Sequence, residues 1–243
     1  MFTGGVIALF WYRLKYQGLM DYWGSTQGVH VAVLILSFVA VAAVAYLLGS
    51  LNFALIISKL KFHDDIRRHG SGNAGMTNML RTYGKAAAVF TLLGDAAKAA
   101  VAIIVGALLN GMIGAYIAGF FCILGHMYPA YYKFKGGKGV VTSAVLVLML
   151  DWRVFLVLFA IFLLIVASTK YVSLGSIMGM LIYPLLLYNF NGPGINILFA
   201  FAISALVIFK HRDNIRRLLE QRENKISFGI KKTKTNSGGG KSD

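Results

Sequence analysis

The chain has 243 residues, of which 58% are hydrophobic and only 14% charged, and its formal net charge is +15. A soluble domain carries about a quarter charged residues, so this composition excludes an ordinary soluble protein and indicates an integral membrane protein. A single cysteine, Cys122, excludes a disulfide within the monomer and a cysteine-built metal site. Nucleic acid is the weaker explanation of the positive charge, because basic residues beside apolar spans are typical of the cytoplasmic side of a membrane.

The first thirty residues contain a short apolar stretch at residues 6–12, followed directly by Arg13 and Lys15. The stretch lacks a small-residue cleavage pattern, so we expect an interfacial helix rather than a signal peptide. The chain therefore divides into an N-terminal extension (1–30), a membrane domain (31–226) and a basic, flexible tail (227–243).

A spanning helix needs about 20 apolar residues, and three runs within the membrane domain reach that length, while three more are slightly short or tilted. They cover residues 31–58, 86–109, 112–132, 154–169, 172–188 and 195–209. A seventh run, residues 140–150, has the length of a re-entrant or partial segment unless it extends back through residues 136–139.

The loops between these runs alternate in charge. Basic residues gather at residues 63–85, at 133–138, around Lys170 and from Lys210 onward, whereas the turns at 110–111 and 189–194 carry none. Because basic loops stay in the cytoplasm, we expect an all-α, polytopic membrane protein with seven transmembrane helices, the N-terminus outside and the C-terminus inside. Five crossings plus a re-entrant hairpin over residues 140–169 satisfy the same pattern.

The first cytoplasmic loop, residues 70–78, is rich in glycine and small polar side chains, and Arg81 follows it. Glycines let backbone N–H groups turn toward an anion, and a guanidinium binds phosphate with two donors. The glycine spacing also matches a dinucleotide-binding fingerprint, but that fingerprint needs a preceding strand. The candidate phosphate ligands here are Ser71, Gly72, Asn73, Thr77, Asn78 and Arg81. The alternative is a polar turn between two helices.

The second loop places Lys138 between Gly137 and Gly139, with Gly136 before them and an apolar helix after them. No Ser or Thr follows the lysine, so the loop is not a Walker A motif. It still predicts a phosphate cradle, and the alternative is a basic turn at the lipid headgroups.

The third motif follows the last span and begins with His211 and Asn214, which share a face of a helix. His211 is suited to orient a substrate or move a proton. The alternative is a basic helix that binds anionic lipid.

Asp95 and Lys98 lie three residues apart within an apolar run, so we interpret them as a structural ion pair. His126 is interpreted as a hydrogen-bond donor at a helix end. Gly175 and Gly179 have the spacing of a helix-packing motif.

Several catalytic patterns are missing from the sequence. It contains no Gly-x-Ser-x-Gly nucleophile elbow, no His-x4-Asp acyltransferase pair and no His/Cys/carboxylate cluster with metal-ligand spacing. The motifs therefore favour phosphate binding over a conventional general base.

The three motifs in order are Gly-Ser-Gly-Asn-x-Gly-x-Thr-Asn-x-x-Arg, then Gly-His-x-x-Pro with Gly-Gly-Lys-Gly-Val, then His-Arg-x-Asn-Ile-x-Arg-Leu. Together they resemble the bacterial PlsY family of acyl-phosphate:glycerol-3-phosphate acyltransferases. The resemblance extends from about Tyr46 to Glu223. The chain departs from the family pattern at Met76, Ala99 and Gln221, which are packing or turn positions.

The resemblance implies seven spans in the bacterial inner membrane, an active site on the cytoplasmic side, and no cofactor or metal. It implies transfer of a fatty acyl group from acyl phosphate to the 1-hydroxyl of glycerol 3-phosphate, giving lysophosphatidic acid and phosphate, the first committed acylation of phospholipid synthesis. The residues carried over as catalytic are Ser71, Arg81, Lys138, His211 and Asn214. Those carried over as substrate-binding are Gly72, Asn73, Thr77, Asn78, Gly136, Gly137, Gly139 and Ser173, with Glu223 structural.

We expect Lys138 and Ser71 to clamp the acyl phosphate, and Arg81, His211 and Asn214 to hold glycerol 3-phosphate. The proton acceptor is a substrate phosphate or, alternatively, His211. The family also implies association with the enzyme that makes acyl phosphate, and we expect a monomer. The alternative from another class is a membrane transporter or an anionic-lipid-binding protein, which would place polar residues near the bilayer midplane.

Overall fold

The computed structural model describes Gly18 and residues 31–226, and every regular element in that part of the chain is helical. The elements are α3 (Val31–Ser50), α4 (Phe53–Phe62), η1 (Ile66–Arg68), α5 (Met76–Tyr83), α6 (Lys85–Met127), η2 (Ala130–Tyr132), α7 (Val140–Leu150), α8 (Trp152–Thr169), α9 (Val172–Asn191), α10 (Ile195–Lys210) and α11 (Arg212–Leu219). The expected interfacial helix at residues 6–12 and the basic tail lie outside the described residues.

The described helices include four that are long and apolar enough to cross a membrane, or five if α10 and α11 are counted as one bent span. Large apolar side chains point outward all along them, among them Val31, Leu164 and Leu198, each about 70% exposed. Such a continuous apolar perimeter is stable only in lipid. The chain is an all-helical, polytopic integral membrane protein.

Helix α6 is interrupted at Asn110 and Gly111, whose backbone leaves the helical region, with Gly111 at φ 58°. A Cβ added to Gly106 would collide with the carbonyl oxygen of Gly114. Eight residues of straight helix cover about 12 Å, so this close approach requires the two halves of α6 to fold back on each other. The turn that the sequence predicts at residues 110–111 is therefore present.

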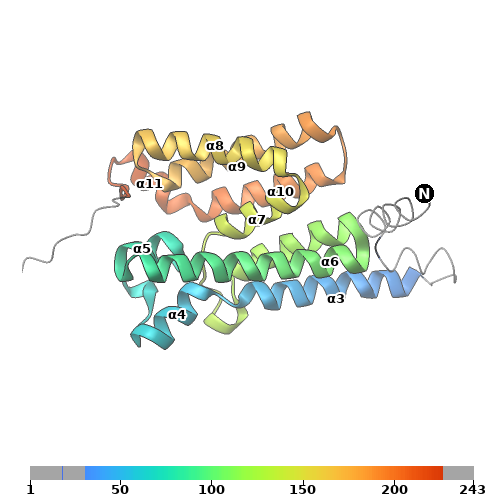
Figure 1. The fold of residues 1–243 in the computed structure, drawn as a ribbon, viewed down its shortest axis with the longest axis horizontal. Coiled ribbons are helices and arrows are strands. Elements are labelled where there is room, and N and C mark those ends of the chain that lie inside the picture. Colours follow the sequence, from blue (N-terminus) through green and yellow to red (C-terminus); the bar gives the residue numbers. More distant parts are fainter. Residues whose placement is uncertain (1–17, 19–30, 227–243) are drawn as a thin grey trace, which may run out of the picture.

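Helix α3 runs beside α6 (Figure 1), and small residues bring the two helices close together. A Cβ at Gly49 would collide with the carbonyl oxygen of Cys122, and one at Gly125 with the carbonyl oxygen of Tyr46. Contacts of this kind are how membrane helices associate without a hydrophobic driving force.

The run predicted at residues 31–58 is confirmed as one candidate span, Val31–Phe62, but the helix breaks within it, because α3 ends at Ser50 and α4 begins at Phe53. Asn52 causes the break, since its side chain accepts a hydrogen bond from Leu55 N and caps α4. Lys98 donates to the carbonyl oxygens of Gly49 and Leu51, which the end of α3 leaves free.

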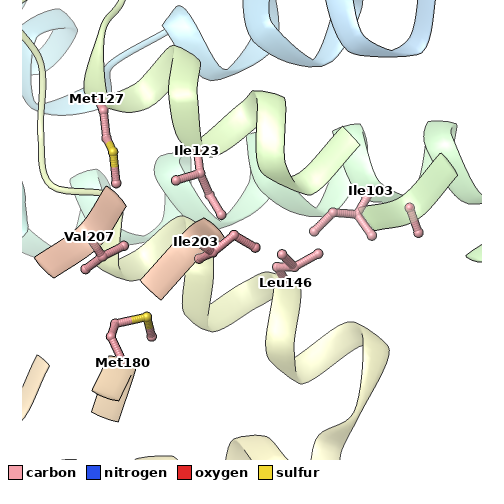
Figure 2. Close-up of a cluster of buried hydrophobic side chains, with 8 residues drawn as sticks. Ile103, Ile123, Met127, Leu146, Met180, Ile203 and Val207 are labelled. Atoms are coloured by element: carbon pink, nitrogen blue, oxygen red, sulfur yellow. The ribbon is translucent and has the colours of Figure 1, made fainter. Parts of the chain in front are cut away.

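Helices α8, α9 and α10 form a second group, and α7 lies between this group and the α3–α6 pair (Figure 1). Side chains from α6, α7, α9 and α10 meet in one buried cluster (Figure 2), which consists of Ile103, Ala115, Ile123, Met127, Leu146, Met180, Ile203 and Val207. This core joins the two groups of helices.

Two opposite ends of the bundle differ in character. At one end, Asp151 caps α8, and both Asp151 and Arg153 hydrogen-bond Asn191, so the α7–α8 turn lies beside the C-terminus of α9. The helices α4, α5 and α11 all lie at the other end (Figure 1), and they carry or flank the polar motifs.

Candidate functional site

The three motifs meet around one cavity of about 530 Å³. Its polar lining consists of Ser71, Asn73, Thr77, Asn78, Arg81, Asp95, Lys138, Ser173, His211, Asn214 and Glu223, together with His126 and Ser176. Gly139 also lines it, whereas Gly72, Gly136, Gly137 and Lys98 do not. The loops predicted to share one face therefore do come together.

Glu223 is the hydrogen-bonding centre of the polar end. It accepts hydrogen bonds from Ser173 Oγ (3.0 Å), Asn214 Nδ2 (2.7 Å) and Arg217 Nε (2.8 Å). Burial raises the pKa of this carboxyl, but these three donors outweigh that effect and hold the pKa below its usual value. Glu223 is therefore an anion that ties the start of α9 to α11.

The chain reaches Glu223 through a tight reversal after α11. Gln221 adopts φ 56°, in the left-handed region that favours glycine, and Arg222 N donates to the carbonyl oxygen of Arg217. The segment is then held by Arg81, whose guanidinium donates to the carbonyl oxygen of Asn224 (3.0 Å). Arg81 in this way links the first motif to the third.

Lys138 reaches the same centre, because its ammonium donates to Asn214 Oδ1. Burial, against an opposing effect of Glu223 and together with the nearby cations Arg217 and Arg81, lowers the pKa of Lys138 to about 8. The amide of Asn214 thus connects Lys138 to Glu223.

The glycine loop before Lys138 is held by hydrogen bonds within the protein. The N–H groups of Gly136 and Gly137 donate to the carbonyl oxygens of Met127 and His126, so they are engaged within the protein. A Cβ at Gly137 would collide with His126 Nε2 and lie 2.7 Å from the carbonyl oxygen of Ala74. These glycines allow close packing of the loop, and the residues that follow them, Lys138, Val140 and Val141, line the cavity.

Asn78 shapes the first loop. Its buried side chain donates to the carbonyl oxygens of Ile66, His69 and Asn73 and accepts from Ser71 N. Since the whole amide is engaged, the side chains of this loop that remain for a ligand are Ser71, Asn73 and Thr77. Gly72, at φ 71°, turns the loop and donates its N–H to the carbonyl oxygen of His69.

His211 is buried between the last two helices. Its Nδ1 lies 2.7 Å from the carbonyl oxygen of Val207, which only accepts, so Nδ1 carries the proton and Nε2 remains an acceptor. Burial and the nearby Lys138 lower the pKa of His211 to about 4. The imidazole is therefore neutral near pH 7 and is a weak base.

Beneath the motifs, Asp95 and Lys98 form an ion pair (2.7 Å). His126 Nδ1 lies 3.0 Å from Lys98 Nζ and 3.5 Å from Asp95 Oδ1. The sequence did not indicate that His126 joins this pair, because 28 residues separate it from Lys98. The cluster fixes both halves of α6 to the end of α3.

The rest of the cavity is apolar. It continues between α7, α8 and α9 along Leu92, Val147, Phe155, Leu158, Phe159, Phe162 and Met180. Within residues 31–226, His, Cys, Asp and Glu side chains form no group of three able to hold a metal ion. The fold and the cavity define an integral membrane protein whose site suits an amphiphile with an anionic head.

Comparison with known proteins identifies the family. A family model described as glycerol-3-phosphate acyltransferase matches residues 39–221. The glycerol-3-phosphate acyltransferase of Nitrobacter winogradskyi is 43% identical over 184 residues, covering 76% of this chain and 93% of the relative. That of Clostridioides difficile is 40% identical over 198 residues, covering 79% and 97%.

Two solved structures are also similar. A crystal structure of PlsY, an integral membrane glycerol 3-phosphate acyltransferase, in its glycerol 3-phosphate form matches with a TM-score of 0.75 and 37% identity, covering 79% of this chain and 96% of that one. The lysophosphatidic acid form matches with a TM-score of 0.72 and 35% identity, with the same coverage. The chain belongs to the PlsY-type glycerol-3-phosphate acyltransferase family, which confirms the resemblance, and it is an acyltransferase.

Replacing Glu223 with glutamine tests the link to Lys138. The change removes a negative charge that raises the pKa of Lys138, so the ammonium loses its proton at lower pH. Acyl transfer should decline above about pH 8 in the wild type, and this limb should move to lower pH in Glu223→Gln. The measurement is kcat/KM between pH 6 and 9.5, which reports ionisations of the free enzyme.

The matched control is Glu220→Gln, which removes the same charge from a carboxylate that pairs with the exposed Arg216. Its alkaline limb should stay in place. An unchanged limb in Glu223→Gln would show that this carboxylate does not set the charge on Lys138.

Proposed function

We propose that this acyltransferase takes its acyl group from acyl phosphate and transfers it to the 1-hydroxyl of glycerol 3-phosphate, releasing lysophosphatidic acid and phosphate. The observation that carries the proposal is the two-part cavity. Its polar end gathers Lys138, Arg81 and His211, and its other end is an apolar chamber between α7, α8 and α9. An acyl phosphate has the matching form, with a charged head and a long apolar chain.

The head groups would divide between the motifs. Lys138 and Ser71 hold the acyl phosphate, with the first turn of α7 as a further anion site. Arg81 holds glycerol 3-phosphate, because one of its donors contacts Asn224 and the others remain for a phosphate. Asn214 has both ends of its amide engaged, so it positions Lys138 instead of contacting the substrate directly.

The reaction needs little beyond positioning. The 1-hydroxyl oxygen attacks the acyl carbonyl carbon, the bond from that carbon to the phosphate oxygen breaks, and phosphate leaves with the bonding electrons. Because acyl phosphate is already activated, orientation and charge stabilisation can supply most of the rate. Ser71 and Lys138 would stabilise the negative charge that develops.

The hydroxyl proton would pass to a substrate phosphate. The carboxylates that line the cavity, Asp95 and Glu223, are both engaged with cations. His211 has a pKa of about 4, whereas a phosphate monoester has its second pKa near 6 and is the stronger base. His211 then orients the hydroxyl by accepting a hydrogen bond from it at Nε2.

A pH–rate profile separates the two bases. If a substrate phosphate is the acceptor, the acidic limb near pH 6 should remain in His211→Ala while kcat falls. Steady-state rates measured between pH 4.5 and 8 give both the acidic limb of the profile and the affinity for glycerol 3-phosphate. Loss of that limb with unchanged affinity for glycerol 3-phosphate would instead make His211 the base.

The activity itself is tested with purified protein in detergent, acyl phosphate and glycerol 3-phosphate, by measuring phosphate release and lysophosphatidic acid. We expect release by the wild type and a loss of at least about 100-fold in Arg81→Ala, the scale of losing a key charged donor. Arg216→Ala is the matched control, because Arg216 is largely exposed and pairs with Glu220. No release by the wild type, or full release by Arg81→Ala, would contradict the proposal.

We further propose seven crossings in the bacterial inner membrane, with the motifs on the cytoplasmic side. Two observations support this number: the reversal at residues 110–111 and the contact of the α7–α8 turn with Asn191 at the far end of α9. The other end of the bundle, which carries the three motifs, has the basic loops, and basic loops favour the cytoplasmic side. In this topology α7 also crosses the membrane, although it has only eleven residues.

Cysteine labelling tests the crossing of α7. In a Cys122→Ala background, Trp152→Cys and Asn189→Cys should react with a membrane-impermeant thiol reagent on intact cells. Lys170→Cys should react only after the membrane is opened. A re-entrant hairpin over residues 140–169 would instead leave Trp152→Cys unreactive from outside while Asn189→Cys still reacts.

A further inference from the structure

Gly179 lies on α9 beside open space within the protein. It is buried and lines the cavity, yet a Cβ added there would meet no described atom within 4 Å. The predicted helix-packing role for Gly179 is therefore wrong. One turn earlier, Gly175 has that role, because its Cβ would lie 2.9 Å from the ring of Phe162 and 3.1 Å from Val166.

The open space lies between the polar mouth and the deep apolar lining. Ser173 marks the mouth, since it donates to Glu223, and Gly179 follows six residues later, about 9 Å further along the helix. On α8, which runs the opposite way, the lining extends to Phe155, fourteen residues or about 21 Å from Thr169 at the mouth end. A chain that enters from the mouth must pass Gly179 to reach Phe155.

We propose that Gly179 is a specificity-determining residue: the missing side chain leaves the passage through which the acyl chain of the donor reaches the deep apolar lining. The size of the residue at this position then sets the longest acyl chain that the enzyme accepts. This inference rests on the proposed acyl-phosphate donor. Short chains end before Gly179 and are unaffected by its replacement, whereas each methylene kept out of the apolar lining costs about fourfold in binding.

The test is a graded series, Gly179→Ala, Gly179→Val and Gly179→Leu, assayed with octanoyl and hexadecanoyl phosphate. We expect kcat/KM for the hexadecanoyl donor to fall in the order of side-chain volume, by at least about tenfold in Gly179→Leu. The octanoyl donor should stay within about twofold of the wild type. The matched control is Ala160→Leu, which adds bulk on the exposed face of α8 and should leave both donors unchanged.

The ratio of the two rates decides the outcome. An unchanged ratio across the series, or an equal loss with both donors, overturns the role of Gly179. If Gly179→Leu does not fold, the alanine and valine variants still have to show a graded fall in the ratio. A wild type that transfers neither acyl group rejects the proposed donor itself, and with it this inference.

Discussion

The buried carboxylate of Glu223 is the contact on which the polar end of the cavity depends. A charge removed from water is tolerated only where donors surround it, and Glu223 finds them on Ser173, Asn214 and Arg217. Asn214 in turn accepts a hydrogen bond from Lys138, so helices that are distant in sequence converge on one anion. The result is a cluster of cations held near each other before any substrate arrives, which is the preorganisation that phosphate chemistry requires.

The membrane supplies the second constraint. The helices bury small residues where they touch and expose large apolar ones to lipid, so the bundle is held by close backbone approach, as at Gly106 and Gly114. The apolar core of Figure 2 then joins the two helix groups, and the space left between α7, α8 and α9 forms the apolar chamber. A water-soluble phosphate ester and a lipid-borne chain can therefore meet at the polar mouth.

The sequence predicted the helical membrane class, the family, the turn at residues 110–111 and the convergence of the three motifs. Each of these depends on long apolar runs or on motifs that stand together in the chain. It missed the end of α3 at Ser50, because hydropathy does not register the cap that Asn52 makes. It listed Gly137 among the phosphate-binding residues and did not foresee that its N–H donates to the carbonyl oxygen of His126, because that partner is set only by tertiary folding. The sequence did not reveal the open space at Gly179 either, because glycine spacing alone does not distinguish a glycine that contacts a neighbouring helix from one that borders open space.

A structure of this protein with glycerol 3-phosphate bound tests the central claim most directly. We expect its phosphate within about 3 Å of the Arg81 guanidinium, and its 1-hydroxyl directed at His211 Nε2 beside Lys138. Lys59, His63 and Arg68 line a separate polar pocket with Asp64 and Asp65, outside the three-motif cavity. Glycerol 3-phosphate bound there, with the site around Lys138 empty, would contradict the account.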